Sequence, residues 1–236
     1  MSHEQLLEIQ SIDVESGQLR HRRVAMPEIA ELESAQIERA KIQEEIDLVA
    51  AARVEVGTRQ RRFEDEALIV AGKADADDAR LYSGDISGMK DLQAMQDEIA
   101  GLRKRQGGLE DQALEAMEEA ETLAEQIAEV ESSQTSVNDR ITVLEAEIAA
   151  TQGEIDRRLD EISLQRETAA GEVDASDLDN YERLRPGFES ATVVKFDGHK
   201  CVGCPSTMPA MEVDRMKRAD ADTVLSCSEC GRIVLR

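Results

Sequence analysis

Residues 81–88 read LYSGDISG, and this short stretch interrupts a chain that otherwise has the composition of helix. Two glycines and two serines within eight residues are typical of a turn. Aromatic residues make up 2% of the 236 residues, charged residues make up 33%, and tryptophan is absent. Because ordinary globular cores rely on large aromatic side chains, this composition indicates long helices or coiled coil on either side of the turn.

Apolar residues repeat every seven positions on both sides of this turn. After it, one series starts at Leu92 and a second at Met95, and the two interleave at spacings of three and four residues. This a/d pattern predicts one helix over roughly residues 88–168. The segment before the turn carries a matching heptad series: Ile42, Val49, Val56, Phe63 and Val70.

The two heptad series indicate a long antiparallel coiled-coil hairpin whose tip lies near residues 81–88. Placing Val70 beside Met95 sets apolar residues against apolar residues along both helices. The midpoint of that register falls between Tyr82 and Ser83, inside the turn. The seam and the turn therefore agree on a hairpin.

Pro27 predicts an interruption in the first helix of the hairpin. Proline is tolerated in the first turn of a helix, but it breaks a helix interior. We therefore expect a break near residues 22–27, with a second helix starting at Pro27. A kink within one continuous helix is the alternative. The hairpin as a whole is expected over residues 1–177.

All four cysteines lie in two CxxC pairs near the C-terminus, separated by 22 residues: Cys201, Cys204, Cys227 and Cys230. Two residues between cysteines let one tight turn present both sulfurs, and four thiolates match the tetrahedral preference of structural Zn²⁺. We predict one structural zinc ion in a small β zinc ribbon, which forms a domain over residues 178–236. The sequences ATVVKF and RIVL, which flank the cysteines, are expected to form its short strands.

Other interpretations of the cysteines are a redox-active pair, two disulfides, or a site in which His199 replaces one ligand. A redox CxxC normally opens a helix in a βαβ unit, and the sequence around these cysteines does not have that character. Catalytic zinc is not expected, because four cysteine ligands leave no open position for water.

The formal net charge of −23 is unevenly distributed along the chain. Residues 196–236 hold six bases and six acids, so residues 1–195 carry all of the −23. An acidic body disfavours nucleic-acid binding along its length, since phosphate contact needs clustered Lys and Arg. Any contact with nucleic acid is therefore expected to be local.

Nothing in the sequence indicates secretion, membrane insertion or catalysis. The N-terminal MSHEQLLEIQ lacks the basic start and apolar run of a signal peptide, and no stretch approaches the roughly 18 apolar residues of a membrane span. No P-loop is present, and the three histidines suggest no Ser–His–Asp set. We expect a cytoplasmic, non-enzymatic protein with no membrane partner and no small-molecule substrate.

Several stretches beyond the cysteines resemble one bacterial family. MPE at 26–28 is similar to that family's Leu-Pro-Glu break, and LYSG at 81–84 with MKDLQAMQDEI at 89–99 is similar to its hairpin tip and returning helix. YERLR at 181–185 and CSECGRIVL at 227–235 are similar to its ribbon sequences. The chain thus resembles the coiled-coil plus four-cysteine (C4-type) zinc ribbon family, which is presumed to bind nucleic acid.

This resemblance implies a mainly α fold with a small zinc ribbon and a role in RNA binding, transcription or assembly of macromolecular complexes. It names no partner for this chain. One departure is Arg236, where the family usually has tyrosine, and a missing aromatic residue removes a surface on which a base could stack.

The ribbon offers the first candidate surface for nucleic acid, through its basic residues: Lys200, Arg215, Lys217, Arg218, Arg232 and Arg236. Arg183 and Arg185 lie just upstream, beside Tyr181. An evenly mixed surface charge is the alternative, and four thiolates on Zn²⁺ would add negative charge.

The hairpin offers two further candidate surfaces for a partner. The predicted register sets Arg62 opposite Arg103 and brings six cations to one level: Arg59, Arg61, Arg62, Arg103, Lys104 and Arg105. These cations either contact phosphate or an acidic protein, or form a salt-bridged girdle with neighbouring acids.

The tip carries four aspartates: Asp75, Asp77, Asp78 and Asp85. Some coiled-coil factors insert an acidic tip into RNA polymerase, and by analogy these aspartates could act at the polymerase. The alternative is that they serve solubility alone.

The sequence therefore predicts a zinc-ribbon adaptor that binds nucleic acid, RNA in first place, or a protein of transcription or translation. The coiled coil would act as spacer and protein-binding arm. The alternatives are a purely protein-binding scaffold or chaperone, and an RNA-polymerase-binding factor that uses the acidic tip. Monomer and dimer remain open, although metal-bridged dimerisation at the apex is not expected because the apex reads LYSG.

Overall fold

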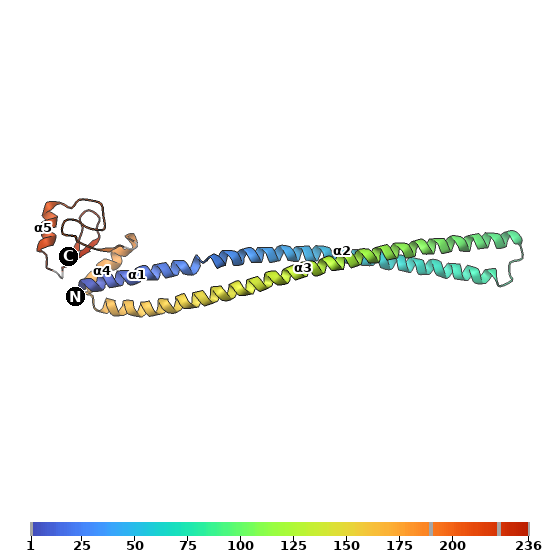
Figure 1. Ribbon diagram of the computed structural model, residues 1–236, viewed down its shortest axis with the longest axis horizontal. Helices are drawn as coiled ribbons and strands as arrows, with labels where there is room; N and C mark the ends of the chain where they lie inside the picture. The colour runs from blue at the N-terminus through green and yellow to red at the C-terminus, as the bar shows by residue number, and fades with distance from the viewer. Residues whose placement is uncertain (1, 189–190, 221–222, 236) are drawn as a thin grey trace. The chain divides into compact units, whose positions relative to one another are not determined.

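The computed structural model describes residues 2–188, 191–220 and 223–235. It divides into two compact units, one formed by residues 1–31 with 144–236 and the other by residues 32–143. The elements in chain order (Figure 1) are α1 (Ser2–Val24), α2 (Pro27–Leu81), α3 (Met89–Gly171), α4 (Ala175–Leu184), the 3₁₀ turn η1 (Arg185–Gly187), β1 (Val193–Lys195), α5 (Ala210–Arg218), β2 (Leu225–Ser226) and β3 (Ile233–Leu235).

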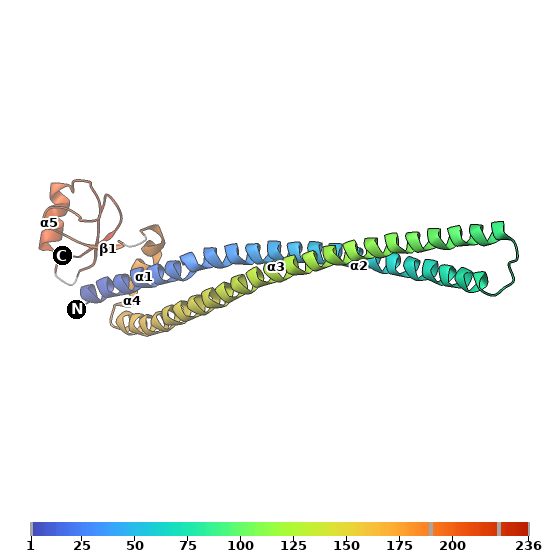
Figure 2. The ribbon, with the colours of Figure 1, turned by 45° about the vertical axis from the view of Figure 1, so that its right-hand side comes forward.

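The second unit is the arm of the hairpin, in which α2 and α3 lie side by side and antiparallel (Figures 1 and 2). The predicted turn is confirmed, because α2 ends at Leu81 and α3 begins at Met89. Gly84 has a φ of 84°, a left-handed conformation that glycine adopts without strain. The hydroxyl of Ser83 donates to the carbonyl oxygen of Arg80 at 2.9 Å, which closes the last turn of α2.

The register predicted between the two helices of the arm is wrong. Arg103 donates from Nη2 to Asp75 Oδ1 at 2.5 Å. The predicted register placed Arg103 opposite Arg62, which lies 13 residues, or about 20 Å of helix, before Asp75. Val70 likewise shares a buried cluster with Leu109, which lies 14 residues beyond its predicted neighbour. The heptad pattern is unchanged by such a slide, so it predicted the hairpin and not its pairing.

The predicted break at Pro27 is confirmed, since α1 ends at Val24 and α2 begins at the proline. Proline fits the first helical position because its missing N–H would have had no partner within the helix. Two side chains of α3 support the end of α1. Gln152 donates to the carbonyl oxygen of Arg23 at 3.4 Å, and the Arg23 guanidinium donates to Asp156 at 2.7 Å.

The ribbon contains a three-stranded sheet in the order β1-β3-β2. β1 pairs in parallel with β3, from Val193 with Ile233 to Lys195 with Leu235, and β2 pairs with β3 in the antiparallel sense. The strands predicted from ATVVKF and RIVL are therefore confirmed as β1 and β3. The short β2 was not predicted.

The hydrophobic core beneath this sheet includes residues from the helices of the hairpin base. Leu6 and Ile9 of α1 are completely buried in it, together with residues from α3, the following loop, α4 and the strands: Ala169, Val173, Tyr181, Val193, Ile233 and Leu235. A second cluster packs α5 onto the cysteine side of the sheet through Met208, Met216 and Val234. The apolar core that stabilises the ribbon thus includes side chains of α1. The domain boundary between residues 177 and 178 stays a prediction.

Gln10 of α1 acts as a pairing partner for the open edge of β1. Its amide nitrogen donates to the Val193 carbonyl at 2.9 Å, and its amide oxygen accepts from the Val193 N–H at 2.6 Å. Gln10→Ala leaves both buried backbone groups unpaired, so we expect a loss of about 1–3 kcal/mol in unfolding free energy. Urea denaturation measures this, with faster hydrogen exchange at the Val193 amide. Gln18→Ala, at an exposed position of the same helix, is the control and should change neither quantity.

Candidate metal centre and basic surface

The four cysteines come together into one cluster. Their sulfur atoms all lie within 4.8 Å of one another, and the Sγ atoms of Cys201 and Cys230 are 3.8 Å apart. Four sulfurs at about 2.3 Å from one tetrahedral ion would be separated by about 3.8 Å. All four cysteines are free thiols, with Cys201 and Cys227 buried. The cluster therefore fits one tetrahedrally coordinated metal ion and has the right size for Zn²⁺.

The loops that carry the cysteines direct backbone N–H groups at the sulfurs. The amides of Gly203 and Arg232 donate to Cys201 and Cys230, in each case from two residues further along the chain. Gly231, which directly follows Cys230, has a φ of 74°, as expected for a glycine that closes a tight turn. These donors stabilise negative charge on sulfur, which a metal-binding thiolate requires.

Gly203 serves the first loop through its small size and not through a left-handed φ. A Cβ at this position would lie 2.7 Å from the Cδ of Arg232 and 2.8 Å from a methyl group of Val194. The residue therefore allows the cysteine loop to pack directly against the sheet. A side chain here would push apart the elements that hold the two cysteine pairs.

The environments of the thiols differ in the absence of a cation. Burial raises the pKa of the Cys201 thiol to about 12 and also raises the pKa of Cys204. Burial acts in the same direction on Cys230, but hydrogen bonds from the backbone and side chain of Arg232 outweigh it and bring that pKa to about 7. A bound divalent cation would hold all four as thiolates.

The candidate metal ligands in the described part of the chain are these four cysteines, without His199. The backbone N–H of His199 donates to Asp197, within the loop that precedes Cys201. Four protein ligands complete a tetrahedron and leave no position for a reacting water molecule. The cluster is thus suited to a structural role.

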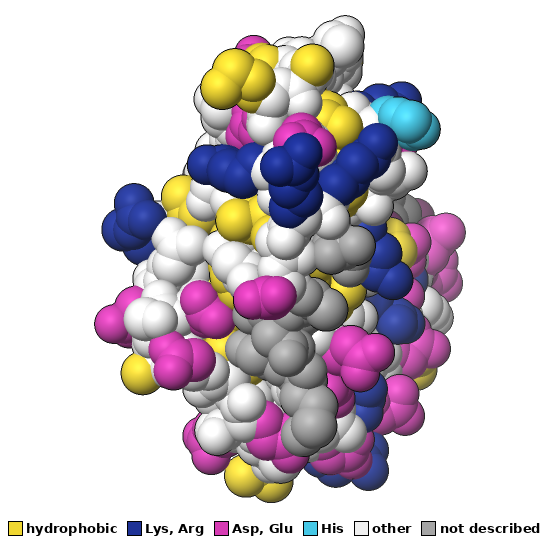
Figure 3. Space-filling view, turned by 90° about the vertical axis from the view of Figure 1, so that its left-hand side faces the viewer, with side chains coloured by type: hydrophobic (Ala, Val, Ile, Leu, Met, Phe, Trp, Pro, Cys, Tyr) yellow, Lys and Arg dark blue, Asp and Glu magenta, His cyan; other side chains and the backbone are white. Residues whose placement is uncertain are grey.

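The basic residues predicted to bind nucleic acid fall into two groups. Arg215, Lys217 and Arg218 lie exposed on α5, and Lys200 is exposed before the first cysteine. Figure 3 shows Lys and Arg side chains gathered in the upper part of the face that includes the ribbon, with Asp and Glu spread below. Arg218 forms an ion pair with Asp214 at 2.8 Å, and this exposed pair within one helix costs little to open. We call these four residues the α5 basic surface.

The other basic residues near the ribbon have structural contacts. Arg232 donates to the Ala191 carbonyl at 2.8 Å and lies over the Phe188 ring, with its guanidinium carbon 4.5 Å from the ring centre. Arg185 pairs with Asp13, as described below, and the exposed Arg183 donates to Asn180. Arg236 lies outside the described residues.

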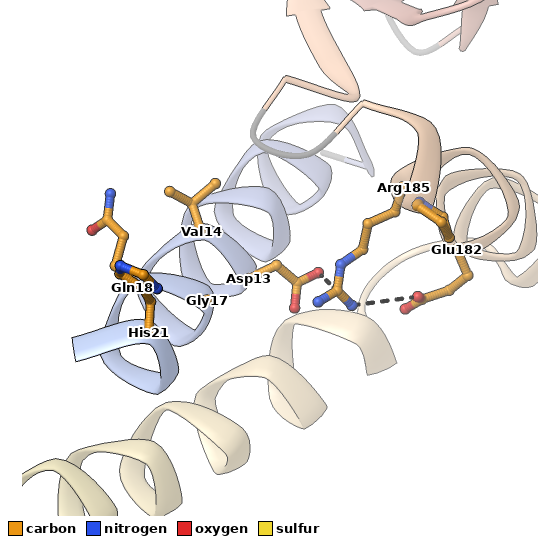
Figure 4. A pocket seen from close by; sticks show the side chains of 8 residues that line it. Asp13, Val14, Gly17, Gln18, His21, Glu182 and Arg185 are labelled. Atoms are coloured by element: carbon orange, nitrogen blue, oxygen red, sulfur yellow. Dashed lines mark ion pairs between the residues drawn. The ribbon is translucent and has the colours of Figure 1, made fainter. Parts of the chain in front are cut away.

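Asp13 of α1 is the centre of a buried ionic network at the base of the hairpin. Its side chain is only 6% exposed and accepts from Arg166 of α3 at 2.7 and 3.2 Å and from the Tyr181 hydroxyl at 2.9 Å. It also forms an ion pair with Arg185 at 3.3 Å. Glu182 pairs with Arg166 and with Arg185. Figure 4 shows Arg185 between Asp13 and Glu182. The hydrogen bonds that Arg166 donates to Asp13 raise the pKa of Arg166, and burial raises the pKa of Tyr181. A hollow of about 850 Å³ lies beside this network, against Gly17 and His21.

The cations expected to form a girdle on the arm do not meet at one level. Arg59 pairs with Glu119, whereas Arg103 pairs with Asp75, so the two ends of the supposed girdle are separated along the hairpin. Arg62 pairs within its own helix with Glu66 at 3.4 Å. The remaining members are exposed: Arg61, Lys104 and Arg105. A single phosphate-binding ring at this position is therefore excluded by the register.

Two of the four aspartates near the tip pair with arginines. Asp75 accepts from Arg103 at 2.5 Å, and Asp77 lies 4.0 Å from Arg80. Asp85 Oδ2 lies 2.8 Å from the Ser83 Oγ, and Asp78 is half-buried on α2. These contacts reduce the concentrated negative charge that the sequence suggested.

Among the described residues, no helix combines the length and apolar character that crossing a bilayer requires.

Comparison with known proteins supports this architecture. The profile of the CT398-like coiled coil hairpin domain family matches residues 9–188. The uncharacterized protein Rv2229c of Mycobacterium tuberculosis is 30% identical over 238 residues, which cover 98% of this chain and 94% of that protein. A solved structure from Mycobacterium smegmatis is similar at a TM-score of 0.84 and 24% identity, covering 100% of this chain and 97% of that chain. CT398 from Chlamydia trachomatis gives a TM-score of 0.67 at 18% identity, over 99% and 97%.

Proposed function

This chain belongs to the CT398-like coiled coil hairpin domain family, and we propose that it is a non-enzymatic, cytosolic adaptor that binds RNA through its ribbon. One structural Zn²⁺, held by the four cysteines, keeps the ribbon folded. The α5 basic surface contacts RNA phosphates, and the helical hairpin serves as spacer and protein-binding arm.

The observation that carries this proposal is the exposure of basic side chains on the ribbon of an otherwise acidic chain. Residues 1–195 hold the full formal charge of −23, which repels phosphate along the hairpin. Three of the four members of the α5 basic surface lie within four residues of one another on α5. RNA is therefore directed to this part of the ribbon, where Lys and Arg can displace counterions from the backbone.

The non-enzymatic character follows from the chemistry of the cysteine cluster. Four thiolates close the coordination sphere of Zn²⁺, so substrate and water are kept from the ion. The ion instead joins the loop after β1 to the loop after β2, and in this way fixes the sheet that presents α5.

Reversing the α5 basic surface tests the proposal. In the variant Arg215→Glu, Lys217→Glu and Arg218→Glu, we expect affinity for a single-stranded RNA of about 20 nucleotides to fall at least about tenfold. The slope of log affinity against log salt should shrink by roughly two, because three phosphate contacts at about 0.7 each are lost. Fluorescence anisotropy of a labelled RNA across a salt series measures both quantities.

The control places the same charge reversal on the arm, at exposed cations: Arg61→Glu, Lys104→Glu and Arg105→Glu. It should retain RNA affinity within about twofold. An equal loss in both variants would mean that overall charge, and not the ribbon, governs the interaction. No RNA complex at low salt would leave the protein-binding scaffold as the function.

A further inference from the structure

A groove on the arm is open along one face of the two paired helices. It has a volume of about 510 Å³ and is lined by residues of α2 and α3: Gln60, Glu64, Ala67, Leu68, Ala71, Gln106, Glu110, Ala113, Leu114 and Met117. All of these lie within the unit of residues 32–143. We infer that this groove binds an amphipathic helix of a partner protein whose apolar stripe is flanked by Lys and Arg, an inference that rests on the proposed role of the hairpin as a protein-binding arm.

The side chains at the floor of the groove are small and those at its walls are large and apolar, as the packing of a third helix requires. Ala67 and Ala113 are buried at the floor, and their methyl groups allow a close approach of another helix. Leu68 and Leu114 form the walls and remain 71% and 51% exposed, while Met117 is 38% exposed. Large apolar side chains that gather around a hollow at this exposure mark an interaction surface.

The length of the groove matches a few turns of helix. Its lining residues on α2 run from Gln60 to Ala71, which is about 17 Å at 1.5 Å per residue. A helix laid along this distance presents apolar residues over about three turns, with spacings of three and four residues. This is the helix-in-groove form of peptide recognition.

Charge decides between a partner helix and a second copy of the chain. The charged residues that line the groove are Glu64 and Glu110, each held on the rim by a glutamine amide at 2.8 and 2.7 Å. Residues 32–143 contain 26 Asp and Glu against 13 Lys and Arg, a formal charge of −13. Two such arms repel each other, whereas Lys and Arg beside an apolar stripe complement the rim.

The test uses a model peptide and the full-length chain. The probe is a labelled peptide of about 18 residues with Leu on one helical face and Lys on the other, compared with a scrambled peptide of the same composition. We expect the patterned peptide to bind at least about tenfold more tightly than the scrambled one in anisotropy titrations. The double variant Leu68→Gln and Leu114→Gln should remove most of this difference.

A matched control changes two equally exposed apolar residues outside the groove, Leu48→Gln and Val143→Gln, which are 73% and 54% exposed in the wild-type chain. This control should bind both peptides as the wild-type chain does. Equal binding of both peptides, or equal loss in the control, would overturn the inference. So would a dimer in sedimentation that the groove variant dissociates, because the occupant would then be a second copy. RNA binding at α5 is measured separately, so either proposal can fail alone.

Discussion

Replacing Cys227 with serine is expected to unfold the ribbon while leaving the arm helical. A structural Zn²⁺ contributes on the order of 10–16 kcal/mol to the folding of small zinc modules. The strands of this ribbon are two or three residues long, so they have little stability of their own. Serine lacks the thiolate, and three remaining cysteines leave the tetrahedron incomplete. Metal content should fall from one zinc per chain to well below one.

The part of the chain that unfolds distinguishes the loss of the metal site from a general destabilisation of the protein. Hydrogen exchange should lose protection over residues 193–235 and retain it along α2, and far-UV circular dichroism should change little, because α2 and α3 span 55 and 83 residues. Treatment of the wild-type chain with a zinc chelator should reproduce the pattern, and added Zn²⁺ should reverse it. Thr207→Ala, at an exposed position between the cysteine pairs, is the control. A reduced, metal-free chain that keeps the protection of β3 would contradict the zinc assignment.

Local sequence features predicted the fold because each constrains the backbone directly. Pro27 is favoured in the first turn of a helix and disfavoured in its interior, and the LYSGDISG stretch contains the glycine that adopts a left-handed φ, Gly84. The two CxxC pairs brought four sulfurs together as their spacing required. The proline and the turn needed no knowledge of contacts between distant residues, whereas the cysteine cluster was predicted from the preference of a structural metal ion for four thiolates.

The register of the hairpin could not be predicted in the same way. A heptad seam presents apolar residues every three or four positions, so sliding one helix past the other keeps apolar layers intact. The pairing is instead distinguished by particular ion pairs, such as Arg59 with Glu119 and Arg140 with Glu38. Individual exposed pairs are worth little, but several in one register favour it over its neighbours.

The roles of the basic residues near the ribbon also depended on contacts that sequence does not show. Arg232 and Arg218 carry the same charge, yet Arg232 lies over Phe188 and donates to a backbone carbonyl, whereas Arg218 is exposed on α5. Composition counts both as possible phosphate contacts. Only the packing of the sheet separates the arginine that holds the ribbon together from the one that is available to a ligand.

The buried network around Asp13 did have a signal in the sequence. Leu6, Ile9 and Ser16 share one face of α1 with Asp13 at spacings of three and four residues, and all four are buried. A carboxylate in an apolar stripe must find cationic partners when the helix packs. The sequence could have flagged the residue, but it could not show that the partners would be Arg166 and Arg185, which come from other elements.

Asp13→Ala is expected to lower the unfolding free energy of the hairpin base by about 3–5 kcal/mol, because removing one partner of a buried ion pair leaves the other uncompensated. Arg166 and Arg185 are 27% and 32% exposed, so neither can return fully to water without moving the elements that carry them. Tyr181 would lose the acceptor of its buried hydroxyl as well. The local structure at the start of the ribbon should open at lower urea concentration.

Tyr181 itself provides the measurement. The chain has no tryptophan and only two tyrosines, so in a Tyr82→Phe background Tyr181 is the sole tyrosine, and its fluorescence reports unfolding at the network. Asp156→Ala in the same background is the matched control, since it breaks an aspartate–arginine pair whose carboxylate is 50% exposed. That change should lower the unfolding free energy much less, because an exposed ion pair contributes little. Equal effects of the two substitutions would show that Asp13 is screened by solvent and does not join α1, α3 and α4.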